Sequence, residues 1–81
     1  MTNAAAAAAL IEALEIAAEA AQGGPTALVS ATIEILAAGE GAPPQARVVR
    51  KTKTLVFAAA EIKSESGALL ASATSVHKIV A

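Results

Sequence analysis

Residues 10–35 decide the fold, and they read LIEALEIAAEAAQGGPTALVSATIEI. Up to residue 22 the apolar side chains recur three or four positions apart, which at roughly 100° per residue places them on one face of a helix. The members of that face are Leu10, Leu14, Ala17 and Ala21. After residue 25 apolar and polar residues alternate, as in a half-buried strand. Gly23-Gly24-Pro25 divide the two patterns, because Gly suits the end of a helix and Pro cannot continue one.

The predicted helix covers residues 4–22, since Thr2 and Asn3 offer a polar N-cap and the alanine run that follows favours helix. Three acidic residues, Glu12, Glu15 and Glu19, lie on the face opposite the leucines. The inner face consists mostly of small side chains. A sheet that curves around the helix is therefore expected to approach its backbone closely.

Four strands are predicted after the helix, at residues 26–37, 45–53, 54–63 and 68–80. Turn-forming residues separate them at 39–44 (GEGAPP) and 64–67 (SESG). In the first strand, alternation predicts one face formed by Ala27, Val29, Ala31, Ile33 and Ile35. We expect an α+β fold in a single domain, 1–81, with one long N-terminal helix packed on a four-stranded antiparallel sheet that runs as a meander.

The composition predicts self-association. A chain of 81 residues buries a limited share of its surface, and its apolar fraction of 56% is mostly alanine, with one Phe and neither Trp nor Tyr. No Cys is present to form a disulfide or a zinc site. Oligomerisation remains as a source of stability, so we expect a homodimer or a tetramer.

Several partner classes are not expected. A net charge of -1 and the lack of aromatic residues for base stacking argue against nucleic acid. The three glutamates interrupt any apolar window long enough to span a membrane. A secretory signal needs a positively charged start, and no Lys or Arg precedes Arg47. The absence of Cys fits a reducing compartment, so we expect a soluble, cytoplasmic protein.

Three segments resemble those of a known family: residues 27–36 (ALVSATIEIL), 46–62 (ARVVRKTKTLVFAAAEI) and 67–74 (GALLASAT). They look like the C-terminal part of hotdog-fold acyl-CoA thioesterases, of the phenylacetate-pathway and 4-hydroxybenzoyl-CoA group, over about residues 9–80. The resemblance implies a hotdog-like fold completed by dimerisation. It also implies thioester hydrolysis without a cofactor, coenzyme A being part of the substrate.

The chain departs from the family pattern at its N-terminal side. Family members usually begin with one or two additional strands and a His-Gly-Gly loop leading into the helix. If Glu15 takes the position of the family's helix carboxylate, that loop falls near Ala6-Ala7-Ala8. The family's Arg-Pro-like pair corresponds to Ala37-Ala38. The resemblance is thus to a shortened thioesterase. Two alternatives stay open: a non-catalytic hotdog module that binds acyl-CoA or serves in assembly, and an incomplete chain whose missing part holds the site.

The resemblance implies that Glu15 is the catalytic residue, acting as nucleophile or as general base on water at the thioester carbonyl. Glu12 or Glu19 takes this role if the alignment is wrong by one helical turn. The competing interpretation is a solvated acidic stripe without function.

Four of the six basic residues cluster at Arg47, Arg50, Lys51 and Lys53. The resemblance places contacts to the phosphates of coenzyme A here, at Arg50, Lys51 and Lys53, and cationic side chains bind phosphate by charge-assisted hydrogen bonds. Alternation sends Arg50 to one face and Lys51 and Lys53 to the other, so the three are not expected to meet one ligand. The equally supported alternative is a strand edge protected by cations.

His77 is the only histidine. One His without neighbouring ligands makes no metal site, and no acid and nucleophile at useful spacing predict a triad. We expect His77 to be a half-exposed strand residue, and Ser30, Ser72 and Ser75 to be structural.

Overall fold

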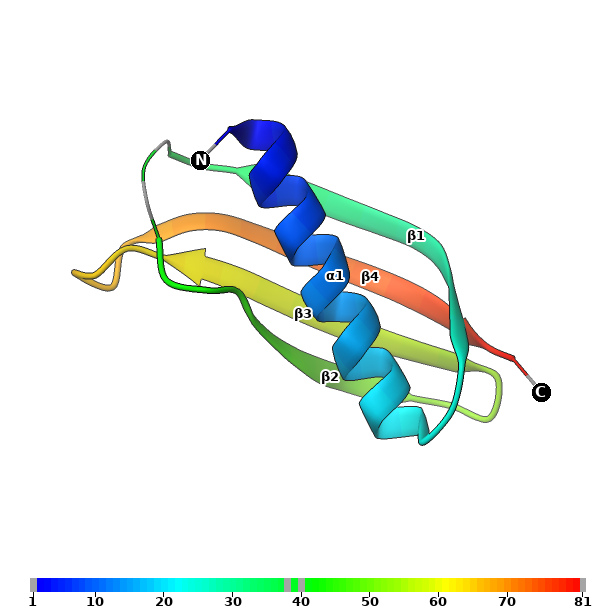
Figure 1. Ribbon diagram of the computed structural model, residues 1–81. Coiled ribbons are helices and arrows are strands. Elements are labelled where there is room, and N and C mark those ends of the chain that lie inside the picture. The colour runs from blue at the N-terminus through cyan, green and yellow to red at the C-terminus, as the bar shows by residue number, and fades with distance from the viewer. Residues whose placement is uncertain (1, 38, 40, 81) are drawn as a thin grey trace.

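A computed structural model describes residues 2–37, 39 and 41–80 (Figure 1). Its elements are α1 (Asn3–Gln22), β1 (Thr26–Ile35), β2 (Gln45–Lys51), β3 (Leu55–Lys63) and β4 (Leu69–Ile79). Figure 1 shows α1 lying across one face of the sheet, and all the paired strands are antiparallel. The predicted architecture of one N-terminal helix packed on a four-stranded antiparallel sheet is confirmed.

Both ends of α1 are fixed by local hydrogen bonds. The Thr2 hydroxyl accepts from the backbone N–H of Ala5 at 3.0 Å, and the N–H of Gly23 donates to the carbonyl of Glu19 at 2.8 Å. Gly23 has a φ of 73°, a left-handed conformation that a residue without a Cβ adopts at little cost. The face toward the sheet contains Leu10, Leu14 and Ala18, all fully buried. Ala21, which was predicted on this face, is exposed.

The strand order is β1-β4-β3-β2, so the predicted meander is wrong. β1 pairs with β4, and the connection after β1 crosses to the opposite edge before β2 begins. Backbone hydrogen bonds hold this connection over the ends of the two central strands: Leu36 and Ala37 donate to Leu70, and Ala42 donates to Lys63. This order places β3 and β4 in the centre, and the buried apolar residues of the sheet all belong to these two strands.

A register shift in each edge strand changes which side chains face the helix. In β1 the shift lies between Leu28 and Ser30, so that Leu28, opposite His77, occupies the helix side where alternation predicted Val29. In β2 the shift lies between Val48 and Arg50, and Val49 is 65% exposed. Such bulges insert one extra residue and restart the alternation.

The core between helix and sheet is narrow and built from small residues. The two leucines of α1 pack on the helix-facing residues of the central strands, Ala58, Ala60, Ile62, Ala71 and Ala73. Alanine removes little area from water, so this core is thin for its length. Among the residues described, no helix is long and apolar enough to cross a membrane.

Candidate functional site

Glu15 lies in the middle of α1, and its side chain is exposed, as are those of Glu12 and Glu19. The charges of Glu15 and Glu19 act on the pKa of His77 beneath the helix, and that of Glu15 acts more strongly. The helix holds this carboxylate above the sheet and in contact with solvent, where a water molecule can reach it.

The basic residues at the end of β2 are divided between two places. Lys51 and Lys53, together with Thr52, Gln22 and Ile79, line an open hollow of about 530 Å³ at the C-terminal end of α1. Arg50 stands opposite Phe57 on β3. The neighbours of Phe57, Val56 and Ala58, face the helix, so Phe57 and Arg50 lie on the far face of the sheet. The expected separation of Arg50 from the two lysines is what the register shows.

The turn that carries Lys53 is held by one side chain. The hydroxyl of Thr52 accepts from the N–H of Leu55 at 3.0 Å and from that of Thr54 at 3.3 Å, while the N–H of Thr52 donates to the carbonyl of Leu55. A threonine hydroxyl that replaces backbone partners in this way stabilises a tight turn. It keeps the two lysines at the mouth of the hollow.

Arg47 does not point to that hollow. Its Nη1 donates to Oε1 of Glu61 at 3.0 Å on the far face of the sheet. The hydrogen bond from Arg47 holds the pKa of Glu61 below its usual 4.5, with partial burial acting in the opposite direction. One of the four clustered cations is thus engaged in an ion pair between strands.

His77 is completely buried, contrary to the expected half-exposed position. The expectation failed because β4 is a central strand beneath α1. Nε2 of His77 lies 2.7 Å from Oγ of Ser75, which is itself only 4% exposed. Burial lowers the pKa of His77 below 6.5, and the nearby carboxylates oppose this effect. Sequence reasoning missed this pair, although Ala71, Ala73, Ser75 and His77 alternate as one buried face.

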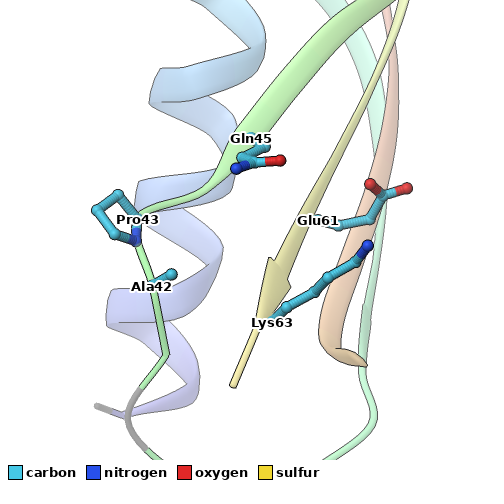
Figure 2. Close-up of a pocket in the computed structure, with 5 residues that line it drawn as sticks. All are labelled: Ala42, Pro43, Gln45, Glu61 and Lys63. Atoms are coloured by element: carbon cyan, nitrogen blue, oxygen red, sulfur yellow. The ribbon is translucent and has the colours of Figure 1, made fainter. Parts of the chain in front are cut away.

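Other hollows lie away from Glu15, and two of them contain polar side chains of the sheet. One, of about 300 Å³, opens on the far face of the sheet between Val49, Phe57, Val76 and polar residues of β1 and β4. The other holds only about 50 Å³ and is shown in Figure 2, where Glu61 and Lys63 from β3 lie beside Gln45 and the Ala42-Pro43 segment. Since a water occupies about 30 Å³ in the liquid, the second hollow is too small for an organic ligand.

Across residues 2–37, 39 and 41–80, no group of three His, Cys, Asp or Glu side chains is placed to hold a metal ion. Nε2 of His77 lies beside Oγ of Ser75, and the charges of Glu15 and Glu19 act on its pKa. The charged groups near His77 and the end of the helix are the carboxylates of Glu15 and Glu19 and the ammonium groups of Lys51 and Lys53.

No protein-family model and no curated protein matches the chain. Of the solved structures that match it, two cover almost all of the chain. The crystal structure of a Bacillus halodurans protein with CoA has a TM-score of 0.87 at 15% identity, with 99% of this chain and 59% of that one covered. The X-ray structure of a protein from the thioesterase superfamily has a TM-score of 0.84 at 18% identity, with 99% and 62% covered.

The chain therefore spans about three fifths of the length of both structures. Likeness at this level of identity establishes a common architecture, and function has to be argued from the site. The helix packed on an antiparallel sheet and the superposition agree with the fold that the resemblance implied: this chain has the hotdog fold.

Proposed function

We propose that residues 1–81 form one hotdog domain that binds an acyl-CoA and hydrolyses its thioester. The observation that supports this most strongly is the close fit to the Bacillus halodurans protein whose crystal structure contains CoA. Fold alone does not assign chemistry, so the proposal also depends on a carboxylate and a phosphate-binding group in suitable places.

In the proposed reaction, Glu15 acts on water. Its carboxylate removes a proton from a water molecule whose oxygen attacks the thioester carbonyl carbon. The C–S bond then breaks, the acid is released, and the proton passes to the departing thiolate of coenzyme A. A nucleophilic role, in which the carboxylate itself attacks and water resolves the mixed anhydride, uses the same residue.

The coenzyme is proposed to bind at the end of α1. The hollow beside Lys51 and Lys53 has a volume of about 530 Å³, within the range of small-molecule sites. The two ammonium groups would pair with the phosphates of the nucleotide portion. Arg50, on the far face, would contact a coenzyme only if that coenzyme is bound by a second copy of the chain.

A second copy is proposed to cover β1. This edge strand is exposed along almost its whole length, and the apolar side chains at or beside it include Leu28, Val29, Ile35 and Leu36. A long exposed apolar edge promotes pairing with another strand. We therefore propose a homodimer or tetramer, acting in the cytoplasm.

The enzyme proposal is tested with a panel of acyl-CoAs and release of free thiol as the readout. Glu15→Gln keeps the size of the side chain and removes the base, so kcat is expected to fall about 10²–10⁴-fold. Glu12→Gln, on the same helix and also exposed, is the control and should keep full activity. If Glu12→Gln is inactive and Glu15→Gln is active, Glu12 is the base instead of Glu15.

The binding site is tested separately with unhydrolysed coenzyme A in calorimetric titrations. The double variant Lys51→Gln/Lys53→Gln is expected to weaken binding at least about tenfold, since each charge-assisted contact contributes about 1.5–3 kcal/mol. Arg50→Gln distinguishes two arrangements: unchanged affinity indicates a site within one copy, and weakened affinity indicates a site shared between copies. Unchanged affinity in the lysine variant would refute the proposed site.

The quaternary proposal is tested by sedimentation equilibrium. Wild type is expected to sediment as a dimer or tetramer, and Val29→Lys, which places a charge on the β1 edge, is expected to shift it toward monomer. Glu34→Lys, on the same strand at a polar position, controls for the change in charge. A monomeric wild type would contradict this part of the proposal.

A non-catalytic acyl-CoA-binding module is the second candidate. It is favoured by one observation, the exposure of all three helix glutamates, which is typical of a solvated acidic stripe. Saturable binding of acyl-CoA without thiol release across the panel would support the module and reject the enzyme.

A further inference from the structure

His77 and Ser75 form a polar pair inside an otherwise apolar interface. Both side chains project from β4 toward α1, and Nε2 of His77 lies 2.7 Å from Oγ of Ser75. In the row of paired residues through His77, the neighbour on β1 is Leu28 and the neighbour on β3 is Val56. Neither can hydrogen-bond to an imidazole, so the sheet satisfies only one of the two ring nitrogens.

The second ring nitrogen, Nδ1, is the one buried side-chain nitrogen or oxygen without a hydrogen-bond partner in the part of the chain that the structure describes. Buried polar atoms in native proteins nearly always have a partner, so an orphaned one indicates a contact that forms in another side-chain conformer or with a ligand. The partner must come from one of the elements packed around the ring.

Lys78 follows His77 on β4, so its side chain lies on the far face of the sheet. Lys51 on β2 lies in the same row as His77, but Val56 of β3 separates them. The remaining polar side chains belong to the helix, and of these Gln22 lines the open hollow with Lys51 and Ile79. The charges that act on the ring belong to Glu15 and Glu19 of α1, and Glu15 has the larger effect on the His77 pKa. Ala18 is completely buried against the sheet, and Glu15, three positions before it, and Glu19, next to it, border this buried face of the helix.

We propose that His77 is a positioning residue for Glu15: its Nδ1–H donates to the Glu15 carboxylate, while the Ser75 hydroxyl donates to Nε2. This arrangement satisfies every polar atom of the pair and requires the Nδ1–H tautomer, because a carboxylate can only accept. It joins β4 to α1 through three side chains. It would also restrict an otherwise mobile glutamate to one orientation, as a base that must meet a substrate requires.

The tautomer is tested directly by NMR of the imidazole ring nitrogens, and the chain's single histidine gives one unambiguous set of signals. In wild type the proton is expected on Nδ1. Glu15→Gln is expected to lower the His77 pKa further, Glu19→Gln to lower it less, and Glu12→Gln to leave it unchanged. A proton on Nε2, or a His77 titration that Glu15→Gln does not alter, would overturn the proposal.

The catalytic consequence rests on the proposed function, and it has a separate readout. His77→Asn keeps an N–H near the Nδ1 position, whereas His77→Leu removes it. Hydrolysis by His77→Asn is expected to exceed that by His77→Leu at least tenfold in kcat, with similar KM. Equal loss in both variants would reject the positioning role. If no acyl-CoA is hydrolysed by wild type, the proposed function fails, and the NMR result still decides the hydrogen bond.

Discussion

Arg47 on β2 and Glu61 on β3 form a diagonal pair across two neighbouring strands. Arg47 stands opposite Ala59 and Glu61 opposite Gln45, yet Nη1 and Oε1 are 3.0 Å apart. Diagonal neighbours on one face of a sheet are within reach of long side chains. The pair links the edge strand β2 to the central strand β3. Because Arg47 is engaged in it, three cations of the cluster, Arg50, Lys51 and Lys53, remain as candidates for phosphate binding.

The Arg47–Glu61 pair is expected to contribute about 0.2–1 kcal/mol in a double-mutant cycle of Arg47→Gln and Glu61→Gln, because both side chains remain partly exposed. The folded state lowers the pKa of Glu61 below 4.5, so the contribution is present above pH 4.5 and is lost as the pH falls through the folded-state pKa. Urea unfolding on each side of that pH measures it. A coupling energy that does not change with acid would contradict the assignment.

Acid is expected to destabilise the fold through His77 in a separate and higher pH range. Burial lowers the His77 pKa, so the unfolded chain binds this proton more readily than the folded chain does. Stability is therefore complete above pH 6.5 and falls as the pH drops from 6.5 through the folded-state pKa. His77→Asn cannot titrate here and should lack this step in urea unfolding curves, while Glu61→Gln, the control, should retain it.

Sequence patterns predicted the elements well because their signals are local. The helix ends where Thr2 caps it and where Gly23 adopts a positive φ, and both residues stand in the sequence at those points. Alternation in β3 and β4 reports burial on one face, and no bulge shifts their register between Leu55 and Ile62.

The order of the strands was predicted wrongly because it depends on pairing over long distances. Residues 36–44 are compatible with a hairpin as well as with a crossing, and hydrogen bonds to Leu70 and Lys63 select the crossing. The bulges at Val29 and Val49 also lack a local signal. The burial of His77 follows from strand order, since a final strand in a meander is an edge, whereas β4 is central.

The crossing connection predicts that glycine is favoured at position 41. A Cβ added there would lie 2.6 Å from Cγ2 of Ile62, 3.0 Å from the carbonyl of Lys63 and 3.1 Å from Cδ1 of Leu70. Gly41→Ala is therefore expected to destabilise the fold by about 1–3 kcal/mol through overpacking. Gly24→Ala, where an added Cβ meets nothing within 4 Å, is the matched control in urea unfolding. Equal stability of the two variants would argue against this path of the connection.

The thin core predicts unusual sensitivity to the loss of one leucine. Leu14 is completely buried against alanines of β3 and β4, which are too small to close a cavity left beneath the helix. Leu14→Ala is expected to cost about 2–5 kcal/mol, a large part of the total for a chain of 81 residues. Ile16, two positions along the same helix and 59% exposed, provides the comparison.

Ile16→Ala should change the free energy of unfolding by no more than about 0.5 kcal/mol if that surface is free, and by more if a second copy covers it. Repeating both unfolding curves at several protein concentrations separates the two cases, because stability that derives from association rises with concentration. A Leu14→Ala cost as small as that of Ile16→Ala would mean that the helix does not pack on the sheet through Leu14.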